Sequence, residues 1–158
     1  MSYNGGCYCG KVRFELTGPV QSAQVCHCSI CRHLQSSSLG QLASFFKKED
    51  FNVTEGKDFL NEFVTPLKYS RKFCKECGTR IGISFEKADF DVPFVVVYPT
   101  TIDELKNTKD LPNEFKPQRH IFYADRLYDQ NDGVMKFADM PKEFGGSGKM
   151  LDHSGQEI

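Results

Sequence analysis

Seven cysteines lie in three short segments of this chain of 158 residues. The segments are Cys7-x-Cys9, Cys26-x-Cys28-x-x-Cys31 and Cys74-x-x-Cys77. Two cysteines separated by two residues on a tight turn place both sulfurs on one side of the backbone, where they can bind one tetrahedral metal ion at about 2.3 Å. Gly78 follows Cys77 and suits such a turn, because glycine readily adopts a positive φ.

Four of the seven cysteines are enough for one closed site, and the first and third segments supply them most simply. Gly5, Gly6 and Gly10 flank Cys7 and Cys9, and they allow the bend that a C-x-C pair needs before both sulfurs can reach one metal. Buried free cysteines are the alternative, because a thiol packs as a small hydrophobe. Three tight groups favour a metal over that alternative, and four soft thiolates favour zinc, with iron as the next candidate.

The remaining three cysteines, Cys26, Cys28 and Cys31, raise a different question. A structural zinc site is filled by four protein ligands, whereas a catalytic site keeps one position open for water or substrate. The three cysteines therefore predict an open or labile metal site. Two alternatives stay open at this point: a closed Cys₃His site completed by His27, His33 or a more distant histidine, and a group of metal-free thiols.

The composition is that of an ordinary soluble domain. The formal net charge is −1, with 39% hydrophobic and 26% charged residues, so we expect no general attraction to nucleic acid or to an anionic membrane. No apolar run approaches the ~18 residues of a membrane helix, and the N-terminal MSYNGGCYCG lacks the pattern of a secretory signal. We therefore expect a cytoplasmic protein, with the nucleus as the other compartment, where thiols stay reduced and disulfides are disfavoured.

Hydrophobic residues recur mainly with a period of two, which indicates β-strands. The segment KVRFELT at 11–17 alternates in this way, and the β-branched run FVVVY at 94–98 is typical of a central strand. Strands are predicted at 11–17, 41–46, 59–65, 67–73, 79–85, 93–98 and 120–123.

Helical signal is limited to residues 29–36, with Ser29 as the N-cap, and to residues 101–106. The fold class is therefore all-β with minor short helices. The sequence becomes loop-like and glycine-rich towards its end. We accordingly divide the chain into a zinc-binding β domain at 1–128 and a loop-rich C-terminal extension with a mobile tail at 129–158.

Four segments together resemble the family of glutathione-dependent formaldehyde-activating enzymes and centromere protein V. They are GGCYCGKVRFELTG, CHCSICR, RKFCKECGTRIG and a late HIF, and they cover about residues 4–128. The resemblance implies a β-tent, a fold of packed antiparallel sheets held by zinc. The implied ligands of a structural zinc are Cys7, Cys9, Cys74 and Cys77. The implied second site, described as catalytic and able to bind glutathione, consists of Cys26, Cys28 and Cys31.

The resemblance also implies an activity: glutathione and formaldehyde, or a similar small electrophile, join to form S-(hydroxymethyl)glutathione, which is a carbon–sulfur lyase step run backwards. The partners would be a small-molecule thiol and an electrophile, without nucleic acid or membrane, and a homo-oligomer is compatible with the sequence. Candidate donors to the electrophile are His27, His33, Arg32 and His120, of which His27, Arg32 and His120 are also candidates for binding glutathione. The alternative function is a non-catalytic zinc-binding β module for protein interaction or thiol sensing.

Two departures from the family pattern fall close to the second site. The segment after CHCSICR reads HLQSSSLG, so its glycine comes late, at Gly40. The tryptophan that often follows the late histidine in the family is absent, and Tyr128 is the nearest aromatic residue. These departures bear on the substrate and not on the structural zinc.

Overall fold

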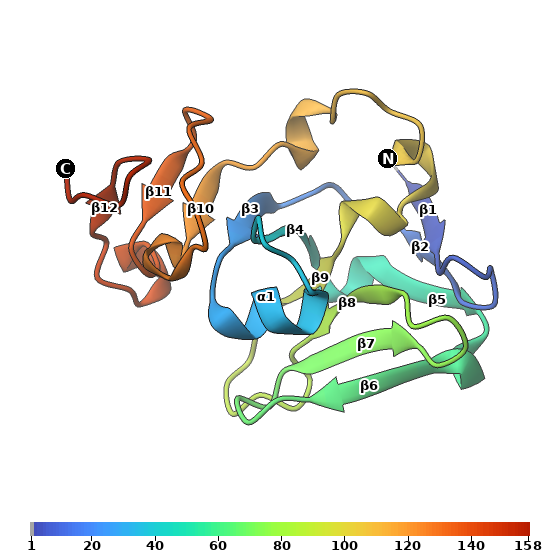
Figure 1. Ribbon diagram of the computed structural model, residues 1–158. Helices are drawn as coiled ribbons and strands as arrows, with labels where there is room; N and C mark the ends of the chain where they lie inside the picture. The colour runs from blue at the N-terminus through green and yellow to red at the C-terminus, as the bar shows by residue number, and fades with distance from the viewer. Residues whose placement is uncertain (1) are drawn as a thin grey trace. The chain divides into compact units, whose positions relative to one another are not determined.

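The computed structural model describes residues 2–158 and shows a chain built mainly from strands (Figure 1). The predicted all-β class is confirmed, with a single α-helix and short 3-10 helices among these residues. The chain divides into two compact units. The first contains the described residues up to Gln21 together with Ser44–Phe115, and the second contains Ser22–Ala43 and Lys116–Ile158. Each unit is therefore assembled from two separate stretches of chain.

An antiparallel three-stranded sheet belongs to the first unit. Its strands, in the order β1-β2-β5, are β1 (Tyr3–Gly6), β2 (Arg13–Leu16) and β5 (Phe51–Glu55). The predicted strand at 11–17 is β2, and its alternation places Phe14 and Leu16 in the core. The sequence did not predict β1, because YNGG has little intrinsic preference for a strand. Pairing with β2, from Tyr3 to Gly6, holds it extended.

A second run of antiparallel strands completes the first unit. In the order β4-β9-β8-β7-β6, these are β4 (Gln41–Lys47, from Ser44 onward in this unit), β9 (Phe94–Val97), β8 (Arg80–Ser84), β7 (Ser70–Cys74) and β6 (Leu60–Val64). Each matches a strand predicted from the sequence. The prediction that the FVVVY run is central is confirmed, because β9 lies between β4 and β8 and three of its valines are buried.

One hydrophobic core joins the two sheets of the first unit. It contains Phe14 from β2, Phe46 from β4 and Val97 from β9, all with 1% exposure or less. Cys7 and Cys74 belong to the same buried cluster. The core therefore reaches the points at which two of the predicted metal ligands leave their strands.

Short 3-10 helices connect the strands. They are η1 (Lys48–Asp50), η2 (Lys57–Phe59), η3 (Pro99–Thr101), η4 (Asp103–Leu105), η5 (Asn113–Phe115), η6 (Tyr123–Asp125) and η7 (Lys142–Phe144). The helix predicted at 101–106 is thus not continuous. Ile102 interrupts it, because this fully buried residue has an extended backbone and forms an isolated bridge with Gly5.

The second unit contains a run of four neighbouring strands, of which the last three in the sequence lie side by side in orange and red in Figure 1. In the order β12-β11-β10-β3, the strands are β12 (Met150–Leu151), β11 (Met135–Phe137), β10 (Arg119–Ile121) and β3 (Ser22–Cys26). The expectation of antiparallel sheets is wrong here, because β10 runs parallel to both β3 and β11. Residues 129–158 supply β11 and β12, so the predicted boundary at 128 falls inside this unit. That boundary and the mobility of the tail stay predictions.

The α-helix of the second unit, α1 (Ser29–Gln35), occupies the segment predicted to be helical. Its N-cap is Cys28 and not Ser29, because the sulfur of Cys28 accepts the backbone N–H of Cys31. The helix ends at Ser36, whose left-handed backbone directs its N–H to carbonyls of the last turn. The N-cap of α1 is therefore itself one of the clustered cysteines.

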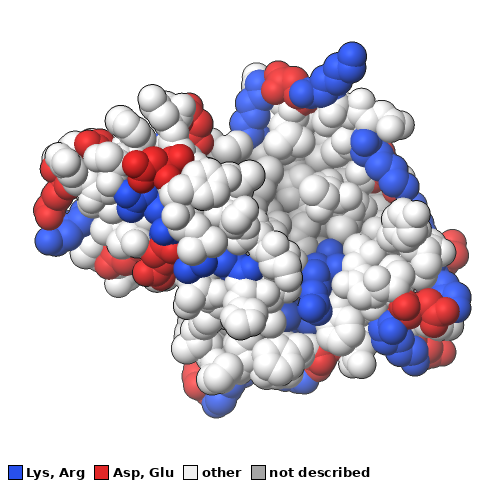
Figure 2. Space-filling view, in the orientation of Figure 1, with Lys and Arg blue, Asp and Glu red and all other residues white. Residues whose placement is uncertain are grey.

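Charges of both signs are mixed on the face shown in Figure 2, where lysines and arginines neighbour aspartates and glutamates. Several of them form exposed ion pairs, such as Lys48 with Asp91 at 3.0 Å. Across residues 2–158, no helix has the length and apolar character that crossing a bilayer requires.

Candidate metal centres

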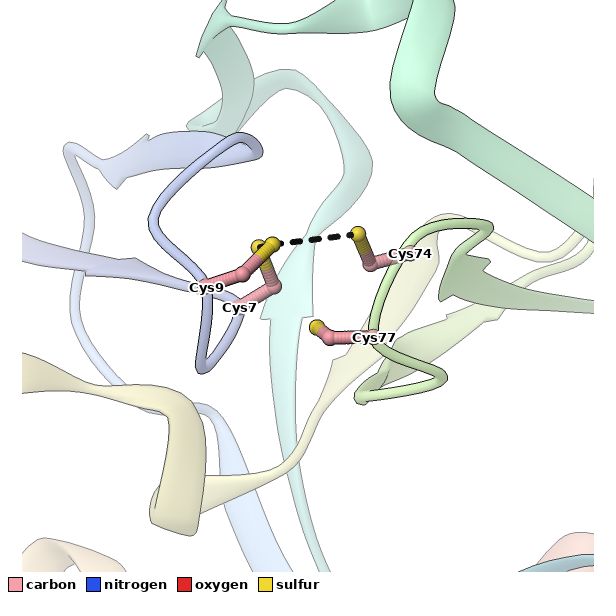
Figure 3. Close-up of side chains that lie close together, drawn as sticks. All are labelled: Cys7, Cys9, Cys74 and Cys77. Carbon is pink, nitrogen blue, oxygen red and sulfur yellow. Dashed lines mark hydrogen bonds between the residues drawn. The ribbon is translucent and has the colours of Figure 1, made fainter.

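The first cluster consists of Cys7, Cys9, Cys74 and Cys77, whose side chains converge on one point (Figure 3). All four sulfurs lie within 4.8 Å of one another, with 3.4 Å between Cys7 and Cys9 and 3.8 Å between Cys9 and Cys74. Four thiolates arranged tetrahedrally at about 2.3 Å from a zinc ion lie about 3.8 Å apart. The structure thus brings together the four cysteines that the sequence paired, at a spacing that fits a tetrahedral metal.

A turn between β1 and β2 presents the first two sulfurs. The N–H of Cys7 donates to the carbonyl of Val12, and the N–H of Gly10 donates to the carbonyl of Cys7, both at 3.0 Å. Gly10 has a φ of +78°, which lets the chain reverse directly after the two cysteines. The N–H of Val12 also donates to the sulfur of Cys7 at 3.2 Å. The turn therefore orients this sulfur and supplies a donor that favours its thiolate form.

The turn between β7 and β8 presents the other two sulfurs. The N–H of Cys74 donates to the carbonyl of Thr79 at 2.9 Å, and the N–H of Gly78 donates to the carbonyl of Cys74 at 2.8 Å. Gly78 has a φ of +75°, as its position after Cys77 predicted. Cys74 is fully buried, whereas Cys77 is exposed. The cluster thus has one side in the core and one side at the surface.

The thiols of the first cluster differ in acidity. Burial raises the pKa of Cys77, but hydrogen bonds from the hydroxyl and N–H of Thr79 outweigh it and lower this pKa to about 6. Burial also opposes ionisation of Cys7, whose pKa is nevertheless lowered by the Val12 N–H and the thiols of Cys9 and Cys74. The Lys11 N–H lowers the pKa of Cys9, but burial and three adjacent thiols raise it to about 12. Cys7 and Cys77 are therefore the first of these residues to become thiolates.

The second cluster consists of Cys26, Cys28 and Cys31, and its three sulfurs also lie within 4.8 Å of one another. Cys26 ends β3, Cys28 caps α1, and Cys31 lies in the first turn of that helix. The Cys28 sulfur accepts the N–H of Cys31 at 3.3 Å. The neighbouring thiols and burial raise the pKa of Cys26, and Cys31 and burial raise that of Cys28 although Cys26 acts to lower it. Without a metal, the thiols of Cys26 and Cys28 therefore hold their protons at neutral pH.

No fourth ligand atom of a Cys, His, Asp or Glu joins the second cluster within residues 2–158. His27, between two of its cysteines, is fully buried and points to another histidine, and His33 is exposed on α1. No disulfide joins any of the seven cysteines across the same residues. This geometry does not form the closed Cys₃His site, and it matches a site with three protein ligands.

His27 begins a hydrogen-bonded chain of polar side chains that is buried except at Asp132, whose side chain is 39% exposed. Its Nε2 lies 2.8 Å from Nδ1 of His120, and Nε2 of His120 lies 2.7 Å from Oδ2 of Asp132. Oδ1 of Asp132 accepts from Nζ of Lys136 at 2.7 Å and from the N–H of Val134 at 3.1 Å. His27 and His120 have 1% exposure or less, and Lys136 has 4%. The second unit therefore contains a continuous hydrogen-bonded chain from its extension to the residue between two clustered cysteines.

The pKa values along this chain follow from burial and charge. Burial, His120 and Arg32 lower the pKa of His27 to about 4. Burial also lowers the pKa of His120, although Asp132 opposes this. Burial raises the pKa of Asp132, but Lys136 and the Val134 N–H outweigh it and lower this pKa to about 2. At neutral pH the chain therefore consists of two neutral imidazoles, a carboxylate and an ammonium group.

Sequence reasoning included His27 and His120 but missed Asp132 and Lys136. Nothing in the surrounding segment distinguishes Asp132 from other loop aspartates. Lys136 is buried in β11, where a lysine is unexpected. Arg32, another candidate, donates from Nε to the carbonyl of His27 at 2.8 Å and so supports the loop that carries the cysteines.

The fold and the two clusters define an all-β protein whose cysteines are arranged to hold metal ions in two places. The family model of the glutathione-dependent formaldehyde-activating enzyme matches residues 2–125. The chain therefore belongs to that family, as the order of its cysteine segments indicated. The match ends before Asp132 and Lys136, which lie in the C-terminal extension.

A solved structure shows a related fold. The crystal structure of a Rhodobacter sphaeroides protein, a structural genomics target, superimposes with a TM-score of 0.51 at 22% sequence identity. The similarity covers 63% of this chain and 87% of that one. At this identity the likeness concerns the fold alone.

Proposed function

We propose that this protein joins glutathione to formaldehyde, or to a similar small electrophile, at the second cluster and so forms S-(hydroxymethyl)glutathione. Membership of the family supports a glutathione-dependent reaction with formaldehyde. The observation that carries the proposal is the second cluster itself, three converging thiols that no fourth protein ligand completes within residues 2–158. Such a site has room for one more soft ligand, and the thiol of glutathione is one.

The reaction is an addition without net oxidation or reduction. The sulfur of glutathione forms a bond with the formaldehyde carbon, the π bond of the carbonyl breaks, and its electron pair takes up a proton on oxygen. The thiol proton is lost and a hydroxyl proton is gained, so the overall proton count is unchanged. The protein must therefore favour the thiolate of glutathione and supply a donor to the oxygen.

Cys26, Cys28 and Cys31 would hold the metal of the second site, for which zinc is the best candidate, and the first cluster would hold a structural zinc. A thiol that coordinates such an ion is deprotonated. The chain's own groups orient the three ligands: Cys31 donates its N–H to the Cys28 sulfur, and Arg32 donates from Nε to the backbone between Cys26 and Cys28. We place the protein in the cytoplasm, where thiols stay reduced.

A shallow pocket of about 380 Å³ on α1 suits the charged ends of glutathione. It is lined by Arg32, His33, Leu127, Ser29, Ser36, Ser37 and Ser38. A guanidinium has five N–H donors, and serine hydroxyls can donate as well, so the pocket offers partners for a carboxylate. Arg32 and His33 are accordingly the predicted contacts of glutathione, whereas His120 is buried away from solvent.

Metal analysis before and after dialysis against millimolar glutathione tests this proposal. We expect two zinc ions per chain, of which one is lost or forms a mixed complex with glutathione. Cys28→Ser should contain a single zinc ion that glutathione leaves in place. Two zinc ions that both resist glutathione in the wild type would contradict the proposal and favour the alternative, a non-catalytic zinc-binding module.

A further inference from the structure

The hydrogen-bonded chain of Asp132, His120 and His27 has one direction of hydrogen-bond donation, and Asp132 sets that direction. Both oxygens of this carboxylate can only accept hydrogen bonds. Oδ1 is occupied by the Lys136 ammonium and the Val134 N–H, so Oδ2 is left for His120 at 2.7 Å. His120 must therefore donate from Nε2. A neutral imidazole carries one proton, and burial disfavours a second, so Nδ1 of His120 is an acceptor.

The same reasoning applies to the imidazole ring of His27. Nδ1 of His120 accepts, so Nε2 of His27, 2.8 Å away, must donate. The remaining nitrogen of His27, Nδ1, then carries a lone pair and no proton. His27 is fully buried, and its Nδ1 has no hydrogen-bond partner within residues 2–158. The series of hydrogen bonds that begins at Asp132 thus ends in an unsatisfied acceptor on His27, the residue between Cys26 and Cys28.

Gly40 packs closely against that acceptor. A β-carbon built on Gly40 would lie 3.0 Å from both Nδ1 and Cε1 of His27 and 2.7 Å from a methyl carbon of Val25. Gly40 also has a φ of +82°, which disfavours any side chain. The glycine that comes late in this sequence therefore lies against Nδ1 of His27, where any side chain would be in tight contact with the ring.

We propose that Asp132 is a positioning residue that sets the tautomers of His120 and His27 and makes Nδ1 of His27 an acceptor for a hydrogen-bond donor. The group that it takes is a hydroxyl, a thiol, an amide N–H or a water, and a carbonyl or carboxylate oxygen is rejected. His27 in this tautomer cannot donate to an aldehyde oxygen from Nδ1, which reverses the role predicted for it. Asp132 lies outside the residues that the family model matches, so the residue that sets these tautomers comes from the C-terminal extension.

Asp132→Asn tests the proposal because it should reverse the direction of hydrogen-bond donation from residue 132 through His120 to His27. Lys136 and Val134 remain obligatory donors, so the amide oxygen must take the place of Oδ1. The amide NH₂ then faces His120 and donates to Nε2, which passes the proton of His120 to Nδ1 and that of His27 to Nδ1 in turn. The measurement is ¹⁵N NMR of the imidazole nitrogens, which distinguishes protonated from unprotonated nitrogens in the four histidines of the chain.

We expect both buried histidines of the wild type to carry the proton on Nε2, and both to move it to Nδ1 in Asp132→Asn. Asp132→Glu is the matched control, because its carboxylate still only accepts, and it should keep the wild-type tautomers. A wild-type spectrum with the His27 proton on Nδ1 would overturn the proposal even if no variant folds. Equal changes in both variants would also overturn it, because position 132 would then act through packing.

The tautomer measurement does not depend on activity, and it is made on zinc-free and zinc-loaded protein alike. A second arm rests on the proposed function: the glutathione-dependent rate should fall about 10-fold in Asp132→Asn and return in Asp132→Glu. This is the low end of the range for groups outside a metal's ligands, because Asp132 acts only through His120 and His27. Tautomers that follow the prediction in a protein without glutathione chemistry would refute the proposed function alone. Tautomers that do not follow it in an active protein would refute the role of Asp132 alone.

Discussion

The first cluster draws its sulfurs from two turns, with Cys9 and Cys74 separated by 65 positions, whereas the second draws all three from one stretch of six residues. A metal bound at the first cluster closes a long loop of the first unit and fixes two hairpins to each other. A metal bound at the second cluster closes only a very short loop, because β3 and α1 already hold its ligands near one another. The comparison teaches that the same ligand type can stabilise a fold in one place and be left available for chemistry in another.

Cys77→Ser should have the largest effect, and on stability. The binding free energy of a structural metal is also folding free energy, so removal of one ligand should cost more than about 4 kcal/mol. For a domain of this size that corresponds to a fall in Tm of roughly 8–16 °C. Thermal unfolding of zinc-loaded protein measures it, with Cys28→Ser as the matched control. Equal losses of Tm in both variants would remove the distinction between the clusters.

Cys28→Ser should have the largest effect on activity. A hydroxyl at this position is a poor ligand for a soft thiolate site, so the glutathione-dependent rate should fall by at least about 100-fold, or ~2.7 kcal/mol in the activation free energy. The rate is followed by NMR with ¹³C-formaldehyde and glutathione, against the uncatalysed reaction. Full activity of Cys28→Ser in folded protein would end the proposed mechanism.

Gly78→Ala should have a smaller effect, confined to the first cluster. A β-carbon at this position meets no atom within 4 Å, so the cost comes only from the left-handed backbone at a φ of +75°. That cost is about 1–2 kcal/mol for a residue with a side chain. Chemical denaturation measures it, and the zinc content should stay unchanged. A loss of unfolding free energy as large as that of Cys77→Ser would mean that Gly78 contributes to stability by more than its ability to adopt a positive φ.

Ser36→Gly should have the smallest effect, with the opposite sign. Ser36 ends α1 with a φ of 51°, a conformation that glycine adopts at lower cost. We expect the second unit to gain about 0.5–1 kcal/mol in its free energy of unfolding. Hydrogen exchange of the α1 amides measures the gain locally. Faster exchange in the variant would show that the serine side chain stabilises this end of the helix.

Both cysteine clusters and many of the strands could be predicted from the sequence, because the signals involved are local. Ligand spacing identified both clusters, and Gly78 needed only its place after Cys77 to indicate a left-handed turn. Alternating hydrophobic residues located β2 and the five strands of the larger sheet of the first unit. A central strand such as β9 is recognisable because both of its faces are buried.

The remaining features depend on contacts between distant segments. YNGG becomes β1 only through pairing with β2, and β10 is parallel to its neighbours because of chain connectivity that no local pattern records. The N-cap of α1 was assigned to Ser29 by residue preference, yet the sulfur of Cys28 takes that role. Asp132 was missed because its importance comes from His120, which is 12 positions away.

The division into two units has a consequence for the order in which the chain folds during synthesis. The first unit has all its strands once residue 115 has been made, so its four clustered cysteines can meet while the rest of the chain is still being translated. The second unit begins earlier, at Ser22, but β3 obtains its partner β10 only after about a hundred further residues. Its sheet forms through contacts of long sequence separation, which is the slow kind of folding step. The segment that carries Cys26, Cys28 and Cys31 is thus the first of its unit to leave the ribosome, long before β10 is available to pair with β3.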